Sequence, residues 1–206
     1  MQQLETRQLS RFGAREFFQG AIKSALNNQH LTASDEAVIY LVNLLLDFLR
    51  SEKLFDSTPD GLTIKPLALL HSEALAANSE LDRTKTLQRL GDVAMFIAGL
   101  YAQSLGRSLV DVDYYIAMGG HAYGFLADSR RYMRKPGGIR VVFNELSEKF
   151  TGFVEILAEV GETYDFNGHR DILRLYELWQ YSGSVRLAKK LQQLGIQPVK
   201  THRRAH

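Results

Sequence analysis

The sequence contains no cysteine among its 206 residues and only four prolines. The lack of cysteine excludes a disulfide framework, a thiolate zinc site and a cysteine nucleophile, and it fits a reducing compartment. The scarcity of proline leaves room for long helices. The chain also lacks a run of the roughly eighteen apolar residues that a membrane-spanning helix needs. Its longest uncharged runs, residues 93–106 and 114–127, have fourteen residues each and are typical of helices buried in a protein.

A secretory signal is not expected either, because charges interrupt the first twenty residues and no apolar segment follows them. We therefore expect a cytoplasmic protein with no membrane partner. The apolar fraction of 45% and the charged fraction of 23% are near the averages of globular proteins, which excludes wholesale disorder. We expect one α-helical domain over residues 1–200, in which residues 169–195 could form a helical subdomain, and a flexible tail at residues 201–206.

Apolar residues recur at helical spacing through most of the chain, which predicts an all-α bundle of about seven helices. We expect the helices of residues 85–104 and 108–129 to form a close-packed central hairpin, because the connection between them is short. Residues 54–64 fit either a short β-hairpin or an irregular loop. The remaining helices are expected at residues 14–27, 35–49, 66–78, 141–160, 169–181 and 185–194.

A stripe of small residues follows each of the two central helices at helical spacing. The first consists of Gly91, Ala94, Ala98 and Ala102, and the second of Ala117, Gly120, Gly124 and Ala127. Glycine inside a helix costs roughly 1 kcal/mol relative to alanine, so these positions need a reason. Three interpretations are open: the stripes pack the two helices against each other, one stripe contacts an identical chain, or the missing side chains leave room for a ligand.

Few polar residues interrupt the central helices, and two of them are candidates for a binding site. Asp92 follows Gly91 on the first helix, and His121 shares a face of the second helix with Tyr114 and Met118. Asp92 and His121 could meet across the hairpin as an acid/base or metal pair. The alternative is that His121 is a core histidine hydrogen-bonded to a carbonyl or a tyrosine. Because no nucleotide, phosphate or metal motif accompanies these residues, the sequence specifies no cofactor and no metal.

Basic residues gather without acidic ones in two segments, residues 130–140 and 186–204. Either segment could bind an anion such as a nucleic-acid phosphate, and either could be ordinary solvated surface. The last two expected helices, with a Ser-Gly-Ser turn between them, resemble a helix-turn-helix in outline. The candidate anion-binding residues are Arg130, Arg131, Arg134, Lys135, Arg140, Arg186, Lys189 and Lys190.

No motif in the sequence specifies a chemical step, and this favours a binding function. We expect a non-enzymatic regulatory or adaptor module that binds another macromolecule as a homo-oligomer, with a protein partner or self-association as the main interaction. The first alternative is a small-ligand or metal-binding protein, enzymes included, with a pocket near Asp92 and His121. The second alternative is nucleic-acid binding through the two basic segments.

Overall fold

The computed structural model describes residues 2–48, 56–58, 61–63, 65–105, 112–133, 138–163, 179 and 185–193. The chain divides into two compact units. The first consists of Met1–Leu49 and Pro66–Tyr164, and the second of Arg50–Lys65 and Asp165–His206. The expectation of a single domain over residues 1–200 stays a prediction.

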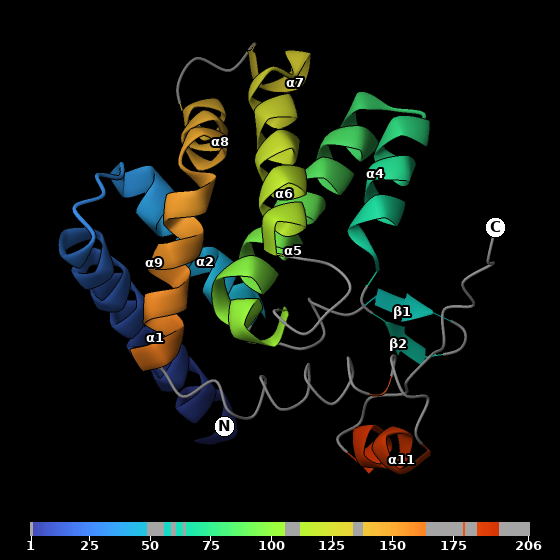
Figure 1. Cartoon of the computed structure of the whole chain (residues 1–206). Coiled ribbons are helices and arrows are strands. Elements are labelled where there is room, and N and C mark those ends of the chain that lie inside the picture. The colour runs from blue at the N-terminus through green and yellow to red at the C-terminus, as the bar shows by residue number, and fades with distance from the viewer. Residues whose placement is uncertain are drawn as a thin grey trace. The chain divides into compact units, whose positions relative to one another are not determined.

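The first unit is built from helices alone within its described residues (Figure 1). This confirms the predicted all-α fold. The helices are α1 (Gln2–Asn28), α2 (Asp35–Phe48), α4 (Leu67–Ala76), α5 (Glu80–Leu105), α6 (Val112–Ala127), α7 (Arg130–Met133), α8 (Ile139–Glu148) and α9 (Phe150–Thr163).

Helix α5 is the centre of the first unit and packs against α2, α4, α6 and α9 (Figure 1). Every residue from 90 to 100 is buried except Asp92, which is part-buried. A helix that is apolar around its whole circumference has to be enclosed on several sides, and the uncharged run of α5 meets this condition. Of all pairs of described helices, α5 and α6 have the most extensive contact with each other. The predicted central hairpin is therefore confirmed.

Serine residues begin two of these helices. The Ser34 hydroxyl accepts a hydrogen bond from the Ala37 N–H at 3.1 Å and caps α2, as expected. The cap of α5 is Ser79, whose hydroxyl accepts from the Asp82 N–H at 3.0 Å. Helix α5 therefore begins at Glu80, before the expected start at residue 85. Thr84 lies inside the helix, and its hydroxyl donates to the Glu80 carbonyl one turn earlier at 2.9 Å.

The helix expected at residues 141–160 is divided in two. Lys149 separates α8 from α9 with backbone angles of φ −106° and ψ 19°, which lie outside the helical range. Its N–H still donates to the Glu145 carbonyl at 3.0 Å, so the chain turns there and loses little hydrogen bonding. The division gives α8 and α9 separate directions: α8 packs mainly on α6, and α9 on α5 and α1.

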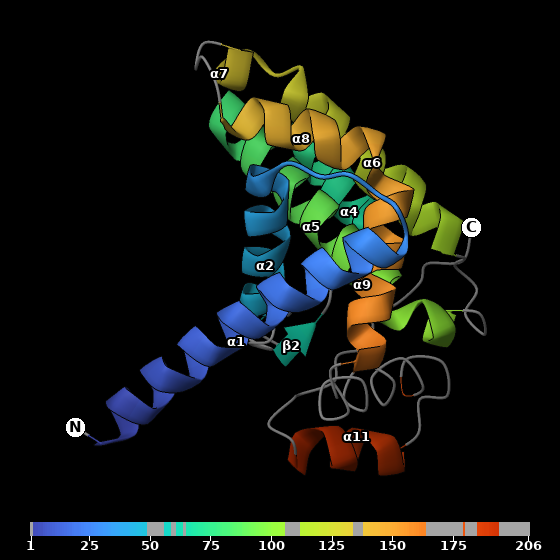
Figure 2. The same ribbon diagram turned by 90° about the vertical axis from the view of Figure 1, so that its left-hand side faces the viewer.

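Helix α1 covers α2 and α9 on the side of the unit that faces the viewer in Figure 2. It begins well before the expected residue 14. Phe18, Ile22 and Leu26 are buried, as the helical spacing predicted, whereas Phe17 is 39% exposed.

The described part of the second unit contains a β-hairpin and a helix. Strands β1 (Asp56–Thr58) and β2 (Gly61–Thr63) pair antiparallel, with Ser57 opposite Leu62, which settles the expectation for residues 54–64 in favour of a hairpin. Helix α11 (Val185–Gln193) matches the last expected helix and buries Leu191. The helix expected at residues 169–181 and the tail at 201–206 lie outside the described residues, apart from Trp179, which is buried.

Candidate functional site

Asp92 contacts two tyrosines. Its carboxylate oxygen Oδ1 accepts a hydrogen bond from the Tyr40 hydroxyl of α2 at 2.5 Å and another from the Tyr123 hydroxyl of α6 at 2.7 Å. Gln88, one turn earlier on α5, donates from Nε2 to the Tyr40 hydroxyl at 3.2 Å. We call these four residues, Asp92, Tyr40, Tyr123 and Gln88, the Asp92 cluster. The sequence identified Asp92 but none of its partners.

Aromatic rings enclose the two tyrosines. The Phe143 ring of α8 stacks on the Tyr123 ring with centroids 5.8 Å apart and meets the Tyr40 ring edge-on at 5.9 Å. The two tyrosine rings contact each other at 6.1 Å. Gly91 makes this packing feasible, because a Cβ at that position would lie 2.7 Å from the Tyr123 ring. The three rings therefore pack together beside the hydroxyls that bind the carboxylate, and four helices meet at the cluster.

Burial sets the electrostatics of the cluster. It raises the pKa of Asp92 from 3.8 to about 6, because a carboxylate loses hydration there. The hydrogen bonds from Tyr40 and Tyr123 and the charge of Arg89 act in the opposite direction, whereas the nearby charge of Asp47 adds to the increase. The pKa values of Tyr40 and Tyr123 lie well above their usual 10, through burial and through the charge of Asp92. Both hydroxyls thus stay protonated and remain donors.

His121 is not part of this cluster. The side chain of His121 is exposed on α6, and the carboxylate of Asp92 is bound by Tyr123, two residues further along the same helix. Residues two apart on a helix point to different faces, so α6 presents Tyr123 to Asp92 and turns His121 away. Tyr114 is 37% exposed and Met118 is half-buried. The structure therefore brings Asp92 together with two tyrosines and does not bring it together with His121.

The outward side of α6 carries its own group of residues. Tyr114, Met118, His121 and Phe125 lie within about a 60° sector at 100° per residue. Phe125 is 52% exposed. We call these four residues the outer face of α6. From the sequence we expected Tyr114, Met118 and His121 to share one face, which in one alternative lined a pocket with Asp92. The helical pattern alone does not show which side of α6 is covered by α5.

The small-residue stripes have different neighbours from those expected. On α5, Gly91 and Ala94 do face α6: a Cβ at Gly119 would lie 2.8 Å from the Cβ of Ala94. On α6, however, a Cβ at Gly124 would lie 3.1 Å from the Ser147 hydroxyl of α8, and a Cβ at Gly120 would lie 3.7 Å from Phe150 at the start of α9. That hydroxyl donates to the Gly120 carbonyl at 2.8 Å. Gly120 and Gly124 of this stripe thus pack against α8 and the start of α9, and Gly119 makes the close contact with α5.

Basic residues of the first segment are only partly available for binding an anion. Arg140 donates from Nε to the Ala127 carbonyl at 2.9 Å and so ties α8 to the end of α6. Arg131 is exposed on α7. A shallow, open depression of about 230 Å³ lies beside Arg140, Val141 and Asn144. The side chains of Arg130, Arg134 and Lys135 lie outside the described residues.

The second basic segment is described at one of the three candidate positions on α11. Lys189, one of the candidate anion-binding residues, is exposed on that helix. The side chains of Arg186 and Lys190 lie outside the part of the chain that the structure describes.

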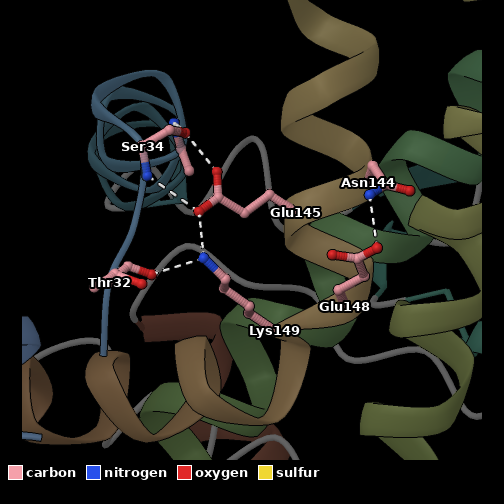
Figure 3. Close-up of polar contacts among 7 residues, drawn as sticks. Thr32, Ser34, Asn144, Glu145, Glu148 and Lys149 are labelled. Carbon is pink, nitrogen blue, oxygen red and sulfur yellow. Dashed lines mark hydrogen bonds and ion pairs between the residues drawn. The ribbon is translucent and has the colours of Figure 1, made fainter. Parts of the chain in front are cut away.

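A second polar cluster, which the sequence did not reveal, joins the α1–α2 connection to α8 (Figure 3). Glu145 accepts from the Ser34 N–H at 3.1 Å and from the Ser34 hydroxyl at 2.5 Å. Lys149 donates from Nζ to Glu145 at 2.9 Å and to the Thr32 carbonyl at 2.8 Å. Burial alone would raise the pKa of Glu145, but these hydrogen bonds outweigh it and lower that pKa. Only the spacing of Glu145 and Lys149, one helical turn apart, was visible in the sequence.

Comparison of the chain with protein-family models, with curated proteins and with solved structures finds no match. Among the described residues, no group of three or more histidine, aspartate or glutamate side chains is placed to hold a metal ion. No helix in the same part of the chain has the length and apolar character needed to cross a membrane. The described helices place the chain in the all-α class, and the comparisons add no family to that assignment.

Proposed function

We propose that the protein is a non-enzymatic regulatory or adaptor module that acts by binding a macromolecule, and that it self-associates through the outer face of α6. The observation that carries this proposal is the exposure of apolar side chains along that face. Phe125 is 52% exposed and Tyr114 37% exposed, on a helix whose opposite side is buried. Large apolar side chains that line up on one exposed face are typical of interaction surfaces. We also propose a cytoplasmic location, on the lack of cysteine.

The packing of the Asp92 cluster supports a non-enzymatic role. Both tyrosine hydroxyls are already engaged with the carboxylate oxygen. The rings around it lie 5.8 to 6.1 Å apart and contact one another directly. The cluster therefore resembles a packed core more than a substrate site.

A second copy of the chain is the occupant that best fits the outer face of α6. The spacings between its four residues are four, three and four. This order reads the same in both directions, so an antiparallel α6 from another copy would place Tyr114 against Phe125 and Met118 against His121. Symmetric dimers use the same patch on both subunits, which such a face allows. The exposed Asp113 and Asp128 lie near the two ends of α6, so salt should strengthen an antiparallel association by screening the repulsion between them.

Sedimentation velocity over a range of protein concentrations tests self-association. The wild type should form dimers as the concentration rises, and Phe125→Glu should remain a monomer with an unchanged fold. Leu75→Glu is the matched control, because Leu75 is 65% exposed on α4 and should leave the dimer intact. A wild type that stays monomeric at every concentration would overturn the proposal. So would equal loss of dimer in both variants.

Binding of a small ligand or metal at Asp92, without His121, is the alternative function, and one observation favours it. The pKa of Asp92, raised to about 6, is in the range of groups that exchange protons at physiological pH. Native mass spectrometry of the purified protein tests this alternative. A bound small molecule or metal that Asp92→Asn removes would support it, and a mass equal to that of the chain would count against it.

A further inference from the structure

One carboxylate oxygen connects three helices. The Oδ1 atom of Asp92, on α5, accepts from Tyr40 of α2 and from Tyr123 of α6. Tyr123 is completely buried, so its hydroxyl has to find its partner inside the protein. Both neighbouring helices donate to the same oxygen. A change in the charge of this carboxyl therefore affects two contacts at once, that of α2 with α5 and that of α6 with α5.

Asp92 is the one member of the cluster that changes charge near neutral pH, because of the groups that surround it. Burial raises its pKa to about 6, and the charge of Asp47 on α2 adds to that effect. Arg89 on α5 opposes it, without cancelling it. From α6 and α8 the packed partners are Tyr123 and Phe143. The pKa values of Tyr40 and Tyr123 are raised well above 10, so these hydroxyls keep their protons.

We propose that the Asp92 cluster is a pH-sensitive switch, in which a proton on the Asp92 carboxyl strengthens the packing of α2 and α6 on α5 and its loss weakens that packing. With the proton bound, the carboxyl is neutral, and Oδ1 still accepts from both tyrosines. Without the proton, the negative charge of Asp92 has lost hydration through burial and lies near the carboxylate of Asp47. The cost of removing a charge from water then acts against the folded arrangement.

The direction of the effect follows from proton linkage. The pKa of Asp92 is 3.8 in a solvated chain and about 6 in the folded one, so the folded state binds more protons between these values. Stability from this group is therefore complete below about pH 4, falls as the pH rises, and levels off above about pH 7. The two pKa values correspond to proton binding that is about 100-fold tighter in the folded chain.

Titration of the Asp92 carboxyl by carbon-13 NMR tests the switch directly, together with melting temperatures of the full chain from pH 4.5 to pH 8. We expect the carboxyl to titrate near pH 6. We also expect the melting temperature of the wild type, relative to that of Asp92→Asn, to fall as the pH rises. The asparagine keeps an oxygen acceptor for both tyrosines and cannot ionise, so subtracting its profile removes the contribution of the histidines. Titration near 3.8, or parallel profiles for the two proteins, would overturn the proposal.

Tyr40→Phe separates a switch from a cluster that only contributes packing. Removing this hydroxyl takes away a hydrogen bond that favours the ionised carboxyl, so the carboxyl should titrate above pH 6 in the variant. An unchanged titration would contradict the assignment, and this arm remains valid if Asp92→Asn does not fold. The pH switch does not depend on self-association. The Phe125→Glu variant, which should be a monomer, therefore allows the switch to be measured without dimer formation. In this variant the hydrogen-exchange rates of the α6 amides should still rise from pH 5 to pH 7.5. The rise should be larger than the intrinsic increase in exchange rate that unfolded peptides show over the same pH range.

Discussion

Two adjacent glycines of α6 have very different surroundings. A Cβ at Gly119 would lie 2.3 Å from the Phe150 ring and 2.8 Å from the Cβ of Ala94. A Cβ at Gly120 would lie 3.7 Å from its nearest neighbour, which is ordinary contact. Gly119→Ala should therefore overfill the core and lower the free energy of unfolding by about 1–3 kcal/mol. Gly120→Ala should be neutral or stabilise the protein by up to about 1 kcal/mol through helix propensity.

Urea denaturation of both alanine variants measures this difference, with each glycine serving as the control for the other. The two substitutions add the same methyl group to the same helix, so propensity cancels in the comparison. Equal stabilities would show that α6 does not pass as close to α5 as Gly119 and Ala94 require.

At the same scale, Asp92 could be predicted from the sequence as an unusual residue, but its partners could not. Tyr40 is 52 residues away in the chain. Tyr123 is only two residues from His121, so the choice between them depends on the rotation of α6 about its own axis. That rotation is set by contacts such as Gly91 with Tyr123 and Gly119 with Ala94, which involve residues that look alike in the sequence. A pattern of small residues on two helices predicts a close approach without specifying which glycine makes it.

At the scale of elements, Glu145 fixes the connection between α1 and α2 onto α8. Its side chain is 13% exposed and holds Ser34 and Lys149 together. Glu145→Gln removes the charge from these hydrogen bonds and should lower the free energy of unfolding by about 1–2 kcal/mol at neutral pH. The pKa of Glu145 is lowered in the folded chain, so its contribution is present above about pH 4.5 and is lost as the pH falls through the lowered pKa.

Chemical denaturation at neutral pH and again below pH 4 tests this contribution. Glu148→Gln is the matched control, because Glu148 is exposed and accepts from Asn144 one turn earlier on the same helix at 2.8 Å (Figure 3). The control should change stability by less than about 0.5 kcal/mol. The deficit of Glu145→Gln should shrink in acid. A deficit that persists unchanged below pH 4 would mean that the carboxylate charge is not its source.

Element boundaries were predictable where a local signal exists and not elsewhere. The serine at position 34 and the acids after it mark the start of α2, and the structure places its cap there. The break between α8 and α9 has no such signal, because Leu146, Phe150 and Phe153 continue one helical spacing across it. Neither glycine nor proline stands at position 149. The turn is a consequence of tertiary packing, in which α8 follows α6 while α9 follows α5 and α1, and tertiary packing overrides local periodicity.

At the scale of the whole molecule, the all-α class was predictable because helical periodicity needs only residues near one another in the chain. The central position of α5 was predictable for a related reason: an uncharged run with apolar residues on all sides has to be surrounded. The binding partners of the exposed surfaces could not be predicted in this way. Whether Phe125 or the basic segments contact another molecule depends on surfaces that no intrachain periodicity constrains.

The balance of charge over the whole chain predicts weak binding to nucleic acid. The 25 basic residues are nearly matched by 23 acidic ones. In addition, Arg140 is engaged with the Ala127 carbonyl. We therefore expect no measurable binding to a labelled duplex DNA of mixed sequence, or to RNA, even at low salt.

If phosphates were the partner, affinity for DNA would fall with a log–log salt slope of about −0.9 for each contacted phosphate. Replacing Arg186, Lys189 and Lys190 by glutamine would then weaken binding equally for all sequences. Fluorescence anisotropy with wild type and the triple variant decides between these outcomes. Micromolar binding at physiological salt, lost in the triple variant, would place nucleic acid ahead of self-association as the function of this protein.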